Sequence, residues 1–212
     1  MSLKILFTKM DIIWGYNNVC IKEGHKWKTA FLMSKGLFKP TIMYFGLYNL
    51  PDTFMHMMQT LFQDMIHQCK CTIYIYMDDL IFKGKTKEEL CQNTLKGLKI
   101  LEKNDLYNKE SKCYWEVDEV PVLGHIVGKG CLCMEATKVK TILDWEMPKN
   151  CKDIQKFNGF CNFYHWYVCA YLKVAWHITH LMGNVPFKWE PKEQAAFNAS
   201  SPQKKSLLNH AL

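Results

Sequence analysis

Arginine is absent from this 212-residue chain, so all 27 of its basic residues are lysines. Proteins that bind nucleic acid commonly use arginine for bidentate contacts with phosphates and bases, whereas lysine supplies a point charge. With 20 acidic residues, the formal net charge is +7. A positive balance fits a polyanionic partner, but it equally fits a solvated surface. The charge alone therefore identifies no partner.

Three further absences narrow the class of protein. No apolar run approaches the length of a membrane span, so we expect no membrane partner. The N-terminus does not read as a signal peptide, which favours an intracellular protein, in either cytoplasm or nucleus. The ten cysteines include no CxxC pair and no zinc-finger spacing. We therefore expect free thiols rather than a structural metal site.

The first half of the chain alternates strand-like and helical patterns, and its length allows one large domain or two small ones. Apolar runs predict strands over residues 5–10, 29–33, 41–45, 71–77 and 80–82, with more strands near 113–117 and 120–127. Apolar residues at helical spacing predict a helix over 51–69. Thr86 and Glu89 form a capping box for a second helix through about Lys103, with Leu90, Leu95, Leu98 and Leu101 facing the core. The pattern predicts an α+β fold.

After about residue 133 the pattern becomes helical. Val139 and Ile142 mark one helix, and Asn150 is expected to cap the next. A third helix is expected over about 168–182, and Pro191 is expected to open a last one. We place a domain boundary near residue 134.

Three aspartates are the strongest candidates for chemistry. Asp78 and Asp79 follow an apolar strand at the tip of a predicted hairpin, and Asp11 follows the strand over 5–10. A polar turn is the alternative interpretation for Asp78-Asp79, because aspartate is common in turns. Three clustered carboxylates repel one another unless cations bind them, and Mg²⁺ prefers such oxygen ligands. Two ions roughly 3.5–4 Å apart would suit an in-line phosphoryl displacement.

The motifs around these aspartates resemble those of reverse transcriptases from gypsy-type (Metaviridae) long-terminal-repeat retrotransposons. The resemblance covers nearly the whole chain, in order. In the first half it rests on Phe7-Thr8-Lys9-Met10-Asp11 with Trp14-Gly15-Tyr16, on Phe45-Gly46-Leu47 through Phe54, on Tyr76-Met77-Asp78-Asp79, and on Leu106-Tyr107 with Lys112-Cys113. Further along it rests on Val122-Leu123-Gly124-His125, Lys138-Val139, Trp145-Glu146-Met147-Pro148, the stretch 157–164, and Phe187-Lys188-Trp189 with Gln194-Ala195-Ala196-Phe197.

The resemblance implies a right-hand polymerase fold, with an antiparallel palm sheet, helices on one face and partial fingers (about 19–50) within residues 1–133. It implies a helical thumb over 134–182 and the truncated start of a connection or ribonuclease-H-like segment over 183–212. The implied function is that of an RNA-directed DNA polymerase. It would extend a primer on an RNA or DNA template with deoxynucleoside triphosphates, using two Mg²⁺ ions, with Mn²⁺ as the alternative metal.

The same resemblance assigns site residues. It makes Asp11, Asp78 and Asp79 catalytic metal ligands, with Asp79 the least direct. It gives nucleotide-binding roles to Tyr16, Phe45 and Lys112. The Tyr16 ring would exclude nucleotides that carry a ribose 2′-hydroxyl, Phe45 would pack near the incoming nucleotide, and Lys112 would donate a proton to the leaving pyrophosphate. Core packing is the alternative for Tyr16 and Phe45, and an ordinary surface position is the alternative for Lys112. Leu123 and Gly124 would contact the primer.

The chain also departs from the family pattern. It starts at the first catalytic motif and stops before any ribonuclease H carboxylates, so we expect a polyprotein fragment that lacks the remaining fingers and the ribonuclease H part. Cys20, His165 and Trp166 stand where family arginines are expected. Single C-to-T or G-to-A transitions convert arginine codons into such residues, which suggests a copy decayed by mutation. The alternatives are therefore an inactive remnant and a non-catalytic nucleic-acid-binding module.

Overall fold

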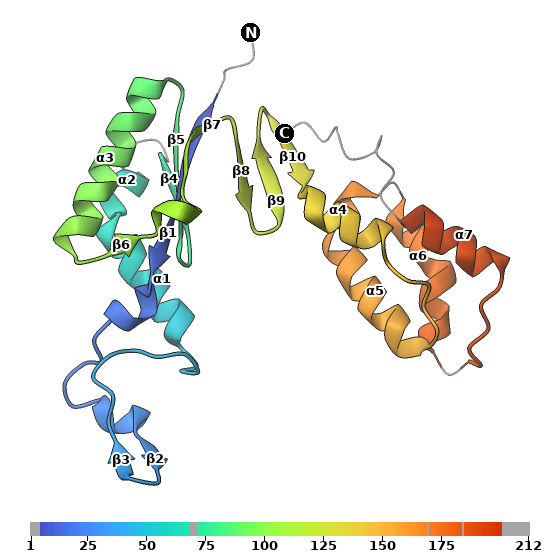
Figure 1. The fold of residues 1–212 in the computed structure, drawn as a ribbon, viewed down its shortest axis with the longest axis horizontal. Helices are drawn as coiled ribbons and strands as arrows, with labels where there is room; N and C mark the ends of the chain where they lie inside the picture. Colours follow the sequence, from blue (N-terminus) through green and yellow to red (C-terminus); the bar gives the residue numbers. More distant parts are fainter. Residues whose placement is uncertain (1–4, 68–71, 169, 184, 201–212) are drawn as a thin grey trace. The chain divides into compact units, whose positions relative to one another are not determined.

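The structure, a computed structural model, describes residues 5–67, 72–168, 170–183 and 185–200. The chain divides into two compact units, Met1–Val120 and Pro121–Leu212 (Figure 1). This division lies ahead of the boundary expected near residue 134. Met134 and Leu132 pack in the core of the second unit. No helix within the described ranges is long and apolar enough to cross a membrane.

The first unit is built on a five-stranded sheet. Its strand order is β4-β5-β1-β6, and β7 also pairs with β1. The pairings that set the register of β1 with β5, β6 and β7, and of β4 with β5, are all antiparallel. The strands are β1 (Leu6–Ile13), β4 (Ile73–Tyr76), β5 (Asp79–Gly84), β6 (Tyr107–Asn108) and β7 (Tyr114–Val117).

One face of this sheet is covered by helices α1 (Leu50–Leu61), α2 (Gln63–His67) and α3 (Lys87–Lys103). Side chains alternate between the two faces of a strand. Met10 and Ile12 of β1 accordingly pack in the core with Phe54 of α1 and Leu90 of α3. Lys9 and Asp11 belong to the alternate set of β1 side chains. Lys9 and Asp11 are therefore on the face away from the helices, whereas Thr8 is buried with Met10 and Ile12.

Several predicted elements differ from the structure. Strand β1 continues past Asp11, because Ile12 and Ile13 pair with β6. No strand forms over 41–45. Instead β2 (Phe31–Met33) and β3 (Gly36–Phe38) make a hairpin. Pro40 follows β3 and has no N–H group to donate to a neighbouring strand, so the pairing is not continued there. The helix expected over 51–69 is divided at Phe62, and residues 68 and 69 lie outside the described residues.

Helix α3 begins as its sequence predicted. The Glu89 N–H donates to Thr86 Oγ1 over 3.2 Å, and the Lys85 N–H donates to Glu89 Oε2 over 2.7 Å. The prediction for its core face is wrong at Leu95, which is 51% exposed. Buried Asn93, Thr94 and Gly97 occupy that face instead, because Gly97 leaves room for the ring of Phe82.

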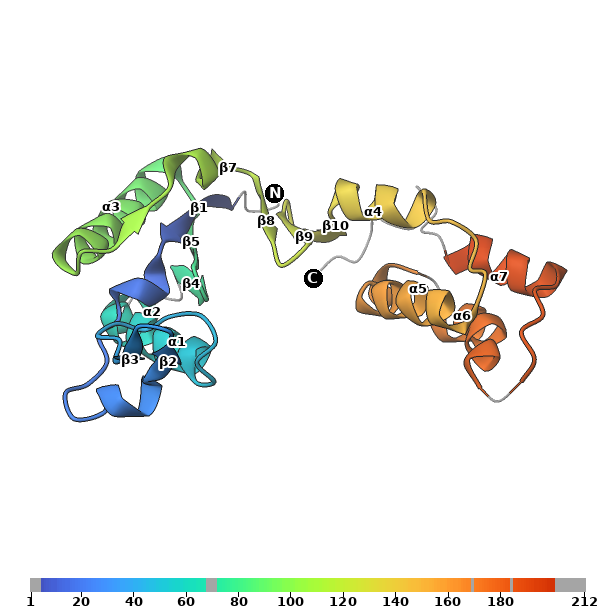
Figure 2. The ribbon, with the colours of Figure 1, turned by 60° about the horizontal axis from the view of Figure 1, so that its bottom comes forward.

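A three-stranded sheet, whose strand β8 begins at Glu119 at the end of the first unit, is followed by the helical group of the second unit. The sheet order is β10-β9-β8, and Figure 2 shows α5, α6 and α7 grouped together. The Asn150 side chain accepts from the Asp153 N–H over 3.0 Å, which confirms the predicted cap. The elements are β8 (Glu119–Val122), β9 (His125–Gly128), β10 (Cys131–Met134), α4 (Ala136–Leu143), α5 (Cys151–Phe163), α6 (Tyr171–Thr179) and α7 (Pro191–Ser200). Short 3₁₀ helices span Gly15–Asn18, Lys26–Thr29, Glu110–Lys112, His165–Tyr167 and His180–Met182.

Candidate active site

Adjacent antiparallel strands bring the three aspartates together. The register of β1 with β5 places Asp11 directly opposite Asp79. Tyr76 of β4 is also paired with Asp79, so the hairpin turn consists of Met77 and Asp78. The Ile12 N–H donates to the Asp78 carbonyl over 3.0 Å and ties this turn to β1. Residues far apart in the sequence are thus held at one site by backbone pairing.

The turn itself is a strained and closely packed segment. Met77 adopts a φ of 50°, a left-handed conformation that is uncommon for residues other than glycine. Its N–H donates to the sulfur of Met55 on α1 over 3.0 Å. A Cβ atom on Gly15 would lie 3.1 Å from Asp78 Oδ1, so the glycine allows the carboxylate to approach the backbone.

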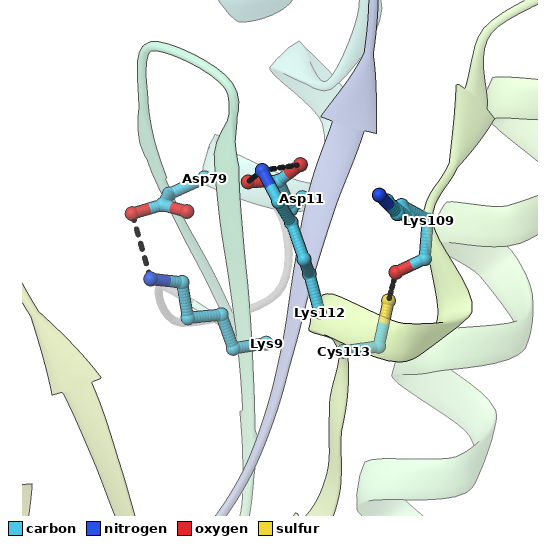
Figure 3. Close-up of polar contacts among 6 residues, drawn as sticks. All are labelled: Lys9, Asp11, Asp79, Lys109, Lys112 and Cys113. Carbon is cyan, nitrogen blue, oxygen red and sulfur yellow. Dashed lines mark hydrogen bonds and ion pairs between the residues drawn. The ribbon is translucent and has the colours of Figure 1, made fainter.

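Two lysines pair with two of the aspartates (Figure 3). Lys112 Nζ lies 3.2 Å from both carboxylate oxygens of Asp11. Lys9 Nζ lies 2.8 Å from Asp79 Oδ2. The Lys112 side chain is 58% exposed, whereas that of Lys9 is 13% exposed. The two ion pairs therefore differ strongly in their access to solvent.

Asp78 is the acid that lacks such a counter-charge. Its Oδ1 atom is buried and has no hydrogen-bond partner among the described residues. Burial raises the pKa of Asp78, the negative charges of Asp11 and Asp79 raise it further, and Lys112 partly opposes them. A buried, unpartnered carboxylate oxygen beside further acids is a donor set that suits a hard divalent cation.

The described side chains do not present a preformed metal site, because no three His, Cys, Asp or Glu residues among them are arranged to hold an ion. Lys112 and Lys9 instead engage the carboxylates of Asp11 and Asp79. The donor chemistry fits a divalent cation, and Lys112 would leave Asp11 when the cation binds.

A pocket of about 450 Å³ lies at this site. Five residues predicted from the sequence line it, namely Asp11, Tyr16, Phe45, Asp78 and Lys112. Asp79 is not among its described lining residues. The predicted residues thus bring two carboxylates, two aromatic rings and an ammonium group to the pocket, which Trp14 and Lys109 also line. The third carboxylate, that of Asp79, pairs with Lys9 instead.

The aromatic part of the pocket is anchored in the core. The Tyr16 ring lies 4.9 Å from that of Phe54, centroid to centroid, and 5.4 Å from that of Phe45 in an edge-on arrangement. Burial raises the pKa of the Tyr16 hydroxyl, and the charge of Asp78 raises it further, so the tyrosine remains neutral near pH 7. Phe45 is 76% exposed, and its ring lines the pocket rather than packing in the core.

Leu123 and Gly124 lie in the second unit, at the turn between β8 and β9. Both have positive φ angles, 51° and 80°. A Cβ atom at Gly124 would lie 2.7 Å from the hydroxyl oxygen of Tyr164, so the glycine is needed for close packing as well as for its backbone conformation. The predicted primer contact of these residues remains a prediction.

Sequence reasoning missed three residues that shape the site: Lys9, Gly15 and Met55. Lys9 precedes Asp11 by two residues, and strand periodicity alone could have placed both side chains on one face. Gly15 was visible only as part of the Trp14-Gly15-Tyr16 motif, and nothing in the sequence marks Met55. The roles of both depend on contacts with Asp78 and Met77 that only the folded chain creates.

Comparisons with known proteins identify the family and the fold. The family described as reverse transcriptase (RNA-dependent DNA polymerase) matches residues 2–127. The retrovirus-related Pol polyprotein from transposon 412 of Drosophila melanogaster is 28% identical over 192 residues, which are 90% of this chain and 15% of that polyprotein. The transposon Tf2-3 polyprotein of Schizosaccharomyces pombe is 27% identical over 198 residues, covering 90% of this chain and 14% of the polyprotein.

A solved structure of a foamy viral protease-reverse transcriptase with an RNA/DNA hybrid has a TM-score of 0.81 to this chain at 20% identity. The match covers 92% of this chain and 26% of the viral one. A second structure, with double-stranded DNA, gives a TM-score of 0.83. This likeness confirms the predicted α+β polymerase fold. Because the family match covers more than half of the residues of this chain, the chain belongs to the reverse transcriptase (RNA-dependent DNA polymerase) family.

Proposed function

We propose that the pocket beside Asp11 and Asp78 is the nucleotidyl-transfer site of an RNA-directed DNA polymerase, within the polyprotein of a gypsy-type retrotransposon. The observation that carries the proposal is the buried, unpartnered Oδ1 of Asp78, which lines one pocket together with Asp11. Template, primer and deoxynucleoside triphosphates are the proposed substrates. The first unit would correspond to the palm with partial fingers, and the helices of the second to the thumb and the segment that follows it.

Each pocket residue has a proposed role. Asp11 and Asp78 would hold two Mg²⁺ ions, with Asp79 less direct; when bound, these ions would stabilise the attacking and leaving oxygens of phosphoryl transfer. Tyr16, fixed against Phe54, would present its ring to the sugar and exclude a 2′-hydroxyl. Lys112, which its exposure leaves free to move from Asp11, would donate a proton to the leaving pyrophosphate.

Primer contacts complete the proposal. Leu123 and Gly124, at the tip between β8 and β9, would support the primer end, because the backbone there can approach a ligand closely. The lysine-rich surface would bind the phosphate backbone as point charges, so binding should weaken as salt concentration rises.

Primer extension on an RNA template with Mg²⁺ tests the proposal. The chain should add deoxynucleotides, and Asp11→Asn and Asp78→Asn should each abolish addition. Asp105→Asn is the matched control: Asp105 lies in the same unit and has a φ of 53°, a conformation that asparagine also tolerates. Salt-dependent template–primer binding without extension in any variant would instead indicate a non-catalytic nucleic-acid-binding module.

A further inference from the structure

Lys9 lies beside the catalytic aspartates and shares their surface of the sheet. In the β1–β5 register, Lys9 is opposite Ile81 and Asp11 is opposite Asp79. The lysine therefore reaches Asp79 diagonally across the two strands, a distance that long side chains span. Its Nζ atom lies 2.8 Å from Asp79 Oδ2, and the two side chains are only 13% and 22% exposed (Figure 3).

The shielding of this pair distinguishes it from the neighbouring one. Removing one member of a shielded ion pair leaves the other charge without compensation, which is strongly unfavourable. Lys112 is mostly exposed and can leave Asp11 for solvent at little cost. Asp79 is therefore held by Lys9, whereas Asp11 and Asp78 remain open to a cation in the pocket.

We propose that Lys9 is a positioning residue: it pairs with Asp79, keeps that carboxylate out of the pocket and so reserves Asp11 and Asp78 for divalent cations. The pocket lining agrees with this division, because it includes Asp11 and Asp78 but not Asp79. The proposal deepens the proposed function and rests on it for the identity of the cation. The ion pair itself does not depend on polymerase activity.

Isothermal titration calorimetry of the full chain with Mn²⁺ tests this role without requiring catalysis. Lys9→Met keeps an aliphatic stem and removes the charge, so Asp79 adds its full negative charge to the cluster. Mn²⁺ should then bind tighter, on the order of tenfold, because one unit of charge has been removed next to a divalent site. The melting temperature in EDTA should fall. Lys9→Arg should restore both values towards those of the parent.

The double variant Lys9→Met/Asp79→Asn separates charge from packing. It removes both charges of the pair, so its Mn²⁺ affinity should return close to that of the parent. Lys83→Met is the matched control, because Lys83 lies in β5 of the same sheet and donates to the Tyr74 hydroxyl over 2.8 Å. Its Mn²⁺ affinity should equal that of the parent.

Three results would overturn the role of Lys9. These are no Mn²⁺ binding by the parent, an effect of Lys9→Met no larger than that of Lys83→Met, or a double variant that behaves like Lys9→Met alone. If Lys9→Met does not fold, Asp79→Asn alone leaves the lysine charge uncompensated and should weaken Mn²⁺ binding; unchanged binding would overturn the proposal. A chain that follows these affinities but extends no primer supports the role of Lys9 and contradicts the polymerase function.

Discussion

Replacing Gly15 with alanine places a methyl group against Phe54 and Asp78. The new Cβ would lie 2.7 and 2.9 Å from the Cζ and Cε2 atoms of Phe54 and 3.1 Å from Asp78 Oδ1. Phe54 is fully buried, so its ring cannot move away into solvent. The backbone of Gly15 has no positive φ, and alanine can therefore adopt it. The cost of the substitution is steric.

The expected loss of stability follows from these contacts. Overpacking a well-packed core typically costs about 1–3 kcal/mol. Alanine recovers about 0.4–1 kcal/mol by restricting the unfolded chain. We therefore expect Gly15→Ala to lower the free energy of unfolding of the first unit by about 1–2 kcal/mol, measured by urea denaturation with circular dichroism and tryptophan fluorescence. Nucleotide addition should also fall, because Asp78 is displaced.

Two further variants test whether the effect of Gly15→Ala is steric. Gly159, inside α5, has no atom within 4 Å of an added Cβ, so Gly159→Ala should stabilise its own unit by about 0.5–1 kcal/mol. In the Gly15→Ala background, Phe54→Leu should cost less than it does alone, because the shorter side chain relieves the contact. A Gly15→Ala protein as stable and as active as the parent would show that the close approach is not a constraint.

Three further predictions address the pocket, the charge balance and a helix cap. Tyr16→Val should raise ribonucleotide incorporation relative to deoxynucleotide incorporation by about tenfold or more, measured as competing primer extension; an unchanged ratio would assign the tyrosine to packing alone. The folded chain holds the Asp78 proton more tightly than the unfolded chain, so the free energy of unfolding in EDTA should fall as pH rises from near 3.8 through the raised pKa of Asp78. Asp78→Asn should remove that fall in urea titrations, and a free energy of unfolding that still falls with pH in this variant would contradict the prediction. Thr86→Ala should lower the free energy of unfolding by about 1 kcal/mol in the same titrations, whereas Thr86→Ser should change it little. Equal stability of the alanine variant and the parent would contradict a capping role for the Thr86 hydroxyl.

The features that the sequence predicted well are those coded by neighbouring residues. The capping box of Thr86 and Glu89 and the cap at Asn150 each depend on residues three positions apart. The Tyr76-Met77-Asp78-Asp79 turn follows from an apolar run that ends in acids. Such signals act through local hydrogen bonds and side-chain alternation, which the sequence displays directly.

Features that depend on distant packing were not predictable in the same way. The pairing of Lys9 with Asp79 requires the register between β1 and β5, which the sequence does not state. Leu95 has the spacing of a core residue, yet Gly97 admits the ring of Phe82 and rotates the buried face of α3. Met134 packs with the helices that follow it, a contact that no local signal in the sequence indicates.

The central claim is that Asp11 and Asp78 form one metal-dependent site for nucleotide addition. Single-nucleotide extension of a DNA primer on an RNA template, measured across Mg²⁺ concentrations for the parent and for Asp78→Asn, tests it most directly. We expect the parent to give an extended primer with a saturable dependence on Mg²⁺ and none in EDTA, and Asp78→Asn to give no product. Equal product from both proteins, or no product from the parent at any Mg²⁺ concentration, would contradict the claim.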